Sequence, residues 1–192
     1  MLEKYLEHST YIDYNNAEVQ QLAKTLSAGV TEEAIIVKKC FEWVRDEIKH
    51  SIDYKMNPVT LKASDVLKYG TGFCYAKSHL LAALLRANDI PTGLCYQRLV
   101  FAENDPRFCL HGLNAVYLKE YGWYRIDARG NKPGVDAQFS PPVEKLAFPV
   151  IHPKEADFRE IWHEPLPVIV AALSTYKDYE SLVQNLPDVE VV

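Results

Sequence analysis

The sequence predicts an α+β fold, in which helices come first along the chain and strands follow. Apolar residues recur with helical spacing to about residue 87. Between about residues 92 and 128 the pattern changes to runs rich in aromatic and aliphatic residues, separated by turn-like sequences. Helices and strands in separate stretches are typical of α+β domains, whereas alternation would indicate a parallel sheet.

Four helices are predicted in the first half, and the first three have a capping residue or a glycine at one end. The first spans about residues 17–28, with Asn16 as its cap and Gly29 as its stop. The second runs from Thr31 to about residue 49, a short third from Ser64 to Gly70, and the fourth from Cys74 to about Ala87. The fourth has Leu80, Leu81, Leu84 and Leu85 crowded on one side. We therefore expect it to be a buried central helix.

Three strands are predicted after the helices, and a proline-dense segment follows them. The strands are Leu94–Phe101, Cys109–Leu118 and Trp123–Ala128. Residues 131–192 hold most of the prolines, so we expect irregular chain around the core, with helices near 168–176 and 178–186. No repeat or flexible linker interrupts the sequence, which predicts one domain over residues 1–192.

Composition excludes several classes of protein. With 21 basic and 26 acidic residues the net charge is −5, and no run of Lys or Arg exceeds two residues. A basic nucleic-acid-binding surface is therefore not expected. The 7 Phe, 3 Trp and 12 Tyr residues supply enough apolar area for a core, which excludes disorder of the whole chain.

The sequence also lacks the signals of membrane insertion and secretion. Its longest apolar runs, Leu80–Leu85 and Val168–Leu173, are far shorter than the roughly twenty residues of a spanning helix. The start has neither the basic nor the apolar region of a signal peptide. We therefore expect a cytoplasmic protein with reduced thiols and no membrane partner.

Cys74 is the strongest candidate for chemistry. The sequence Gly72-Phe73-Cys74 places a thiol in the first turn of the predicted central helix. Unpaired backbone N–H groups and the helix dipole favour the thiolate there, which is the nucleophilic form. The alternative is that Cys74 is a small packing residue.

The remaining cysteines are weaker candidates. Cys40 lies in an amphipathic helix and Cys95 in an apolar strand, so packing explains both. Cys109 precedes His111 by two residues, and the two side chains share a face of one strand. They could form part of a metal site, although two ligands without a second pair are weak support.

His111 and Asp127 can supply a base and its orienting acid. His111 begins one predicted strand and Asp127 ends the next, so an antiparallel hairpin brings them together. A three-residue loop at 119–121 places residue 113 opposite residue 127, and makes His111 and Asp127 diagonal neighbours on one face. An even loop would place them on opposite faces. Alone, each residue could be structural, but with Cys74 upstream a catalytic set is favoured.

These residues occur in a recognisable order. It is Gly72-Phe73-Cys74, then Leu80-Leu81, Leu84-Leu85-Arg86-Ala87 and Ile90-Pro91, then His111, then Trp123 and Ile126-Asp127. The pattern, over about residues 35–130, resembles the core of the transglutaminase-like superfamily of papain-fold enzymes. The resemblance implies a nucleophile helix packed on an antiparallel sheet, with Cys74 as nucleophile, His111 as base and Asp127 as its orienter. It implies no cofactor or metal.

The sequence departs from the family around the site. Leu113 and Asn114 stand where the family often has an aromatic residue and an acid, and Ala128-Arg129 where it often has a proline. The resemblance also implies an oxyanion donor upstream of the nucleophile, beside the Cys74 backbone N–H. The candidates are Trp43, His50 and Tyr54. Packing explains Trp43 and Tyr54 equally well, and His50 could instead interact with a helix C-terminus.

We therefore expect cysteine-dependent acyl transfer on an amide of a peptide, a protein or a small molecule, through a thioester. Hydrolysis is favoured over transglutamination, because Leu113 replaces an aromatic residue that in the family helps to exclude water from the thioester. The alternatives are a family member that has lost catalysis and serves as a binding or scaffold module, and a metal-dependent hydrolase built on Cys109 and His111.

Overall fold

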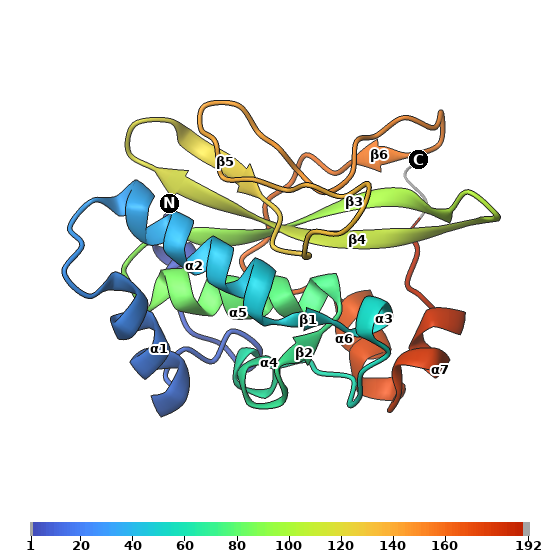
Figure 1. The fold of residues 1–192 in the computed structure, drawn as a ribbon, viewed down its shortest axis with the longest axis horizontal. Helices are drawn as coiled ribbons and strands as arrows, with labels where there is room; N and C mark the ends of the chain where they lie inside the picture. The colour runs from blue at the N-terminus through green and yellow to red at the C-terminus, as the bar shows by residue number, and fades with distance from the viewer. Residues whose placement is uncertain (1, 190–192) are drawn as a thin grey trace.

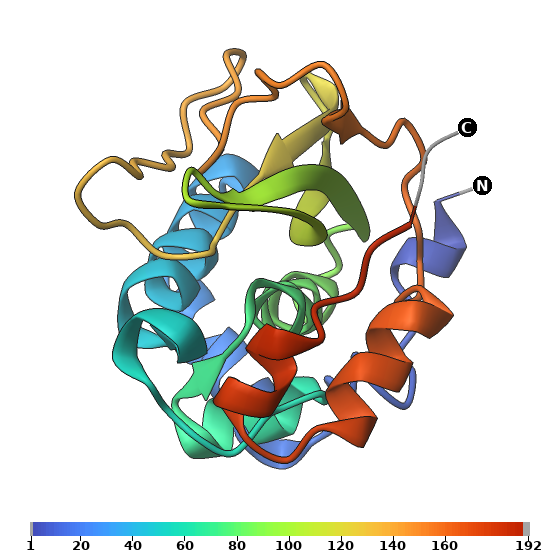
Figure 2. The same cartoon turned by 90° about the vertical axis from the view of Figure 1, so that its right-hand side faces the viewer.

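A fully buried helix, α5 (Cys74–Arg86), runs through the centre of the computed structural model, which describes residues 2–189. All its side chains are buried, including the four expected leucines. It packs on α2 and α4 and on strands β3 and β4. Figure 2 shows α5 nearly end-on, with the sheet above it and helices on both sides. The central helix that the leucine pattern predicts is confirmed.

The remaining helices surround α5 below the sheet (Figure 1). They are α1 (Ala17–Ser27), α2 (Glu33–Glu47), α3 (Ser51–Tyr54), α4 (Ala63–Tyr69), α6 (Pro167–Thr175) and α7 (Tyr179–Gln184), with a 3₁₀ turn at Glu3–Tyr5. Asn16 caps α1 as expected, since its side chain accepts the N–H groups of Glu18 and Val19. Gly70 ends α4 with φ +65°, a left-handed conformation that glycine adopts at little cost.

Two expected helix caps are wrong. Helix α2 begins after Glu32, whose side chain makes no capping bond, so Thr31 lies outside the helix. Ser64 lies inside the first turn of α4, and its N–H and hydroxyl both donate to the Asp13 carboxylate, at 3.0 and 2.6 Å. The acceptor comes from a residue distant in sequence, which local patterns do not reveal.

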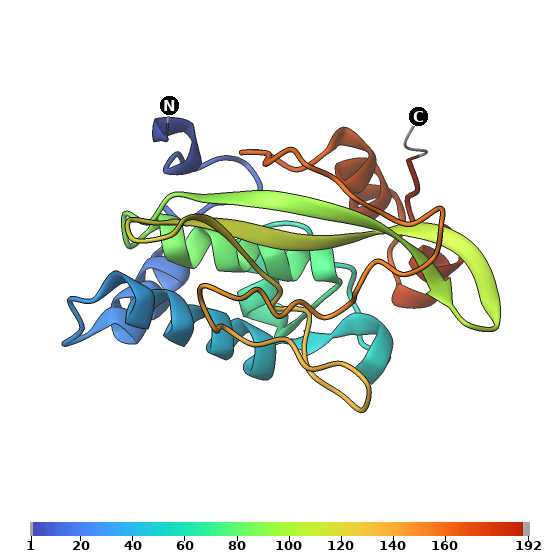
Figure 3. The ribbon, with the colours of Figure 1, turned by 90° about the horizontal axis from the view of Figure 1, so that it is seen from above.

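A curled antiparallel sheet with the order β5-β4-β3-β6 covers α5. Its strands are β3 (Thr92–Ala102), β4 (Asp105–Leu118), β5 (Gly122–Ile126) and β6 (Ala156–Asp157). The β3–β4 hairpin runs along α5 and projects beyond it (Figures 1 and 3). Strand β4 begins earlier than expected because the turn after β3 is tight. β6 is a two-residue edge strand without a sequence pattern of its own.

The register of the β4–β5 hairpin is the expected one. Leu118 pairs with Gly122 across a three-residue loop, and Asn114 pairs with Ile126. One face of the sheet contributes to the core around α5, while the other buries Cys95, Leu113 and Ala115 in a second cluster. Because β5 ends at Ile126, the edge of β4 before Asn114 is left free for another element.

A short parallel pair, β1 (Lys49–His50) with β2 (Thr71–Gly72), links the end of α2 to the start of α5. Lys49 pairs with Thr71 and His50 with Gly72. The Thr71 hydroxyl donates to the Lys49 carbonyl at 2.9 Å, which fixes the pair further. His50 is therefore held beside the residues that lead into Cys74.

The chain between β5 and β6 forms long irregular loops that pass along the edge of the sheet and beside α2 (Figure 2). It is anchored at separate points: Tyr124 donates its hydroxyl to the Val143 carbonyl at 2.9 Å, and Ala137 and Ala147 are buried. Within residues 2–189, none of the helices has the length and apolar character needed to cross a membrane.

Candidate active site

Cys74 is the first residue of α5 and lies where that helix meets the free edge of β4. Phe73, the N-cap, is extended and supplies no side-chain cap, so the first backbone N–H groups of the helix are open to another partner. The Gly112 N–H, beyond the end of β5, donates to the Cys74 Sγ at 3.4 Å. Cys74 is 8% exposed. Two backbone features therefore meet at the thiol, the start of a helix and the N–H of a strand residue.

Gly112 makes this close approach of helix and strand feasible. A Cβ at this position would lie 3.0 Å from the Tyr75 Cα and 3.0 Å from its ring. The backbone of Tyr75 cannot yield to a methyl group at that distance without moving α5. Gly112 is a site residue that sequence reasoning missed, although its position directly after His111 was a usable signal.

His111 and Asp127 face each other on the sheet as the hairpin register predicts. The His111 Nε2 lies 2.8 Å from the Asp127 Oδ2, and both residues are buried. Asp127 also accepts the N–H groups of Arg129, at 3.1 Å, and Ala147, at 3.0 Å. Burial opposes ionisation of Asp127, but His111 and these hydrogen bonds hold its pKa below the usual value. The carboxylate is therefore fixed and charged.

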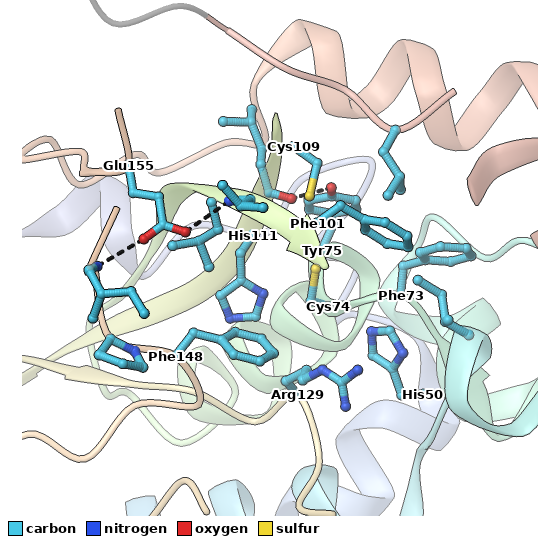
Figure 4. Close-up of a pocket in the computed structure, with 17 residues that line it drawn as sticks. His50, Phe73, Cys74, Tyr75, Phe101, Cys109, His111, Arg129, Phe148 and Glu155 are labelled. Carbon is cyan, nitrogen blue, oxygen red and sulfur yellow. Dashed lines mark hydrogen bonds between the residues drawn. The ribbon is translucent and has the colours of Figure 1, made fainter. Parts of the chain in front are cut away.

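The remaining ring nitrogen of His111 is directed at Cys74, as Figure 4 shows. Burial disfavours the imidazolium, but the charges of Asp127 and Cys74 and hydrogen bonds to both raise the pKa of His111 to about 10. Phe148 covers the ring edge-on, with the ring centroids 5.0 Å apart. A thiol, an imidazole and a carboxylate thus lie next to one another in a row. In this arrangement a protonated His111 can stabilise a Cys74 thiolate.

The other three cysteines are in environments that suppress their reactivity. Burial raises the pKa of Cys40, Cys95 and Cys109 to about 12 in each case. All four cysteines are free thiols. Cys109 lines the same cavity as Cys74, but no group of three or more His, Cys, Asp or Glu side chains suited to a metal ion occurs among residues 2–189.

Of the three oxyanion candidates, the structure brings only His50 to Cys74. His50 lines the cavity and is 4% exposed, and its Nδ1 has no hydrogen-bond partner among the described residues. Burial and the nearby Arg129 charge lower its pKa well below the ordinary histidine value, so the ring is neutral. Trp43 packs against the core and does not line the cavity. Tyr54 is 57% exposed and lines a separate polar pocket behind His50.

Arg129 borders the cavity between His50 and Phe148 (Figure 4). Its guanidinium pairs with both oxygens of Asp53, which also accepts the Lys132 ammonium at 2.7 Å. It lies 5.6 Å from the centre of the Phe148 ring. Arg129 stands where the family often has proline, and its charge is matched inside the protein. Sequence reasoning noted the departure without predicting this ion pair.

The cavity above Cys74 has a volume of about 250 Å³, and most of its lining is apolar. The nucleophile helix contributes Phe73 and Tyr75, the β3–β4 hairpin contributes Leu99, Val100 and Phe101, and the C-terminal half contributes Phe148, Pro149, Ile151 and Leu186. Leu113 is fully buried in the second cluster and does not line the cavity. The expectation that residue 113 forms a wall of the site is therefore wrong.

A thiol at the start of a buried helix, opposite a histidine–aspartate pair on an antiparallel sheet, is the arrangement of papain-like folds. The model of the transglutaminase-like superfamily matches residues 20–128 of this sequence. The chain therefore belongs to the transglutaminase-like superfamily. This confirms the resemblance carried by the motifs from Gly72 to Asp127.

Solved structures show the same fold. One, from Cytophaga hutchinsonii and described as a putative cysteine protease, has 24% sequence identity and a TM-score of 0.53, over 67% of this chain and 42% of that one. Another, the periplasmic domain of TgpA from Pseudomonas aeruginosa, has 18% identity and a TM-score of 0.50, over 66% and 46%. The chain thus aligns with less than half of either structure. No curated protein matches the sequence.

Proposed function

We propose that this protein is a thiol-dependent hydrolase that cleaves amide bonds, as a peptidase or amidase. The observation that carries the proposal is the line of Cys74, His111 and Asp127, with the His111 Nε2 2.8 Å from the Asp127 Oδ2 and the other ring nitrogen directed at Cys74. This is the order of nucleophile, base and orienting acid that acyl transfer needs.

In the acylation step, the Cys74 thiolate attacks the amide carbonyl carbon and forms a C–S bond. The C–N bond breaks as His111 donates its proton to the leaving amine, which departs neutral. A water molecule then attacks the thioester, His111 takes one of its protons, and the C–S bond breaks to release a carboxylic acid and restore the Cys74 thiolate beside a protonated His111. Asp127 keeps the ring oriented and stabilises its cationic form throughout.

The negative charge on the carbonyl oxygen needs hydrogen-bond donors at the tetrahedral stage. The Cys74 backbone N–H, at the uncapped start of α5, is the first donor in this proposal. His50 is the second, because it borders the cavity, is neutral and carries an N–H in either tautomer. The β1–β2 pair holds His50 next to Gly72, so the donor does not have to be ordered during the reaction.

Water is the acyl acceptor in this proposal. Ile151 belongs to the cavity lining and is 82% exposed, so the cavity wall reaches solvent at this residue and water can enter. A peptide library incubated with excess primary amine tests this point. New carboxyl ends or deamidated glutamines are expected, whereas dominant amine adducts would replace hydrolysis by transamidation and leave the nucleophile assignment intact.

The nucleophile itself is tested by alkylation with iodoacetamide at mildly acidic pH, followed by peptide mapping. Cys74 should be labelled before Cys40, Cys95 and Cys109, whose pKa values burial raises to about 12. His111→Ala should slow the labelling, because it removes the cation beside the thiolate. Slow labelling at all four positions, together with library cleavage that persists in Cys74→Ala, would refute the proposed function. Slow labelling without any cleavage would favour a non-catalytic module.

A further inference from the structure

The cavity has chemically different surroundings on the two sides of Cys74. In Figure 4, His111 and Phe148 lie on one side of the sulfur, while Phe73 and Phe101 lie on the other. Phe73, Tyr75 and Phe101 form what we call the aromatic wall. Phe73 and Tyr75 are almost fully buried, and Phe101, near the end of β3, is half-buried.

Apart from His50, which is the proposed oxyanion donor, the polar groups of the cavity lining near the aromatic wall are uncharged or already paired within the protein. The Tyr75 hydroxyl donates to the Leu110 carbonyl inside the protein. The Cys109 thiol is neutral, because burial raises its pKa to about 12. The two charged residues of the lining already have partners within the protein. Arg129 forms an ion pair with Asp53, and Glu155 accepts hydrogen bonds from the backbone N–H groups of Val100, Ile151 and His152.

The proposed reaction determines which part of a substrate meets this wall. His111 protonates the leaving amine, so that amine must lie on the His111 side of Cys74. The acyl group stays attached to the sulfur as the thioester and extends away from His111. It therefore lies against Phe73 and Phe101.

We propose that the aromatic wall is a specificity pocket for a large apolar side chain on the acyl side of the cleaved amide, such as that of leucine or phenylalanine. This inference rests on the proposed function, because the position of His111 defines the acyl side. The cavity of about 250 Å³ has room for such a side chain, and the wall offers it apolar contact.

Selectivity follows from the cost of burying polar groups. A side-chain amide or carboxylate against the aromatic wall would lose its hydrogen bonds to water and gain none from the Phe73 and Phe101 rings. Leucine and asparagine side chains have nearly the same shape, so comparing them isolates this cost from that of fit. We expect the apolar group to be favoured about 30-fold.

The experiment uses two peptidyl chloromethyl ketones that are identical except for leucine or asparagine next to the ketone. The thiolate displaces chloride, so each probe reports how fast its acyl side chain is placed at Cys74. Alkylation is followed by mass spectrometry, and each rate is divided by the iodoacetamide rate of the same protein. The leucine probe should react about 30-fold faster than the asparagine probe.

Phe101→Ala tests the wall directly, and Phe108→Ala is its matched control. Both residues are half-buried phenylalanines of the β3–β4 hairpin, but Phe108 packs under Arg98 and lies outside the cavity lining. Phe101→Ala should lower the leucine-to-asparagine ratio about tenfold, and Phe108→Ala should leave it unchanged.

A ratio near one in the wild-type protein, with rapid iodoacetamide labelling of Cys74, would overturn the pocket and leave the proposed function standing. A ratio that Phe108→Ala lowers as much as Phe101→Ala would overturn it too. Failure of iodoacetamide to label Cys74 would instead overturn the proposed function, and with it the assignment of an acyl side.

Discussion

Two regions meet at the candidate site and are held together in different ways. We call residues 33–130, which hold helices α2 to α5 and strands β1 to β5, the framework, and residues 131–189 the wrap. The framework supplies Cys74, His111 and Asp127, each placed by a helix start or a strand register. The wrap supplies Phe148, Ile151 and other parts of the cavity lining from chain that is mostly irregular.

Many contacts join the two regions, and two of their hydrogen bonds lie beside the site. The Ala147 N–H donates to the Asp127 carboxylate at 3.0 Å, and Glu155 accepts the Val100 N–H at 2.9 Å. The two regions therefore have different roles. The reacting groups need the fixed geometry of helices and strands, whereas a surface that binds substrate can be built from irregular loops. Changes in the framework should therefore affect the chemistry, and changes in the wrap should affect binding.

The largest effect is expected from Asp127→Asn. The amide can donate to the His111 Nε2 and hold the ring in the wrong tautomer, so turnover should fall by about 10³-fold or more with little change in KM. Steady-state kinetics on a leucine-containing substrate measures this. Asp157→Asn is the matched control, since Asp157 likewise pairs with a basic side chain, Arg125 at 2.6 Å, but lies outside the cavity lining. Comparable losses in both variants would contradict the assignment of Asp127.

Gly112→Ala should separate α5 from β4. The new methyl group would meet the Tyr75 backbone at 3.0 Å, which should cost about 1–3 kcal/mol of stability and slow iodoacetamide labelling of Cys74 several-fold. Gly29→Ala serves as a control, because Gly29 has φ +70° with open space around it. It should lower stability through backbone strain while the labelling rate stays the same. Normal labelling in Gly112→Ala would mean that the helix–strand approach does not position the thiol.

Much of the framework could be predicted from the sequence because its determinants are local. The β4–β5 register followed from loop length and the two-residue period of strands, and the start of α5 from Gly72-Phe73-Cys74. His50 could not be separated from Trp43 and Tyr54, because its position depends on the β1–β2 pair, only two residues per strand. Arg129 and Phe148 were missed for a related reason: their place depends on how irregular chain crosses the sheet, and irregular chain carries no periodicity to interpret.

A third prediction concerns Lys77, which is buried inside the framework one turn after Cys74. Its ammonium donates to the Arg45 and Ile48 carbonyls near the end of α2. Burial lowers the pKa of Lys77 from 10.5 to about 7. Between these two values the unfolded chain binds a proton that the folded protein does not, so this group makes stability rise with pH.

Lys77→Met removes that contribution. The free energy of unfolding of the wild type, minus that of the variant, should increase between pH 7 and 10.5 by at most about 1.4 kcal/mol per pH unit. Denaturant unfolding of both proteins across this range measures the difference. A difference that is flat or falls with pH would show that Lys77 stays charged in the folded protein.

The smallest effect is expected from Glu155→Gln, in the wrap. The Glu155 Oε1 accepts the Val100 N–H at 2.9 Å, while Oε2 accepts those of Ile151 and His152 at 2.8 and 2.9 Å. A glutamine side chain has one oxygen that can accept these N–H groups, and its NH₂ group must face the remaining donors. Some of the hydrogen bonds around residue 155, which connect the wrap to the hairpin, are therefore lost. Because Val100 and Ile151 line the cavity, KM for a leucine-containing substrate should rise about three- to tenfold, while kcat stays within about twofold.

Glu160→Gln, an exposed position of the same segment, should change neither constant. A fall in kcat with KM unchanged would mean that the wrap orders the reacting groups themselves, and would contradict the separation of chemistry and binding between the two regions.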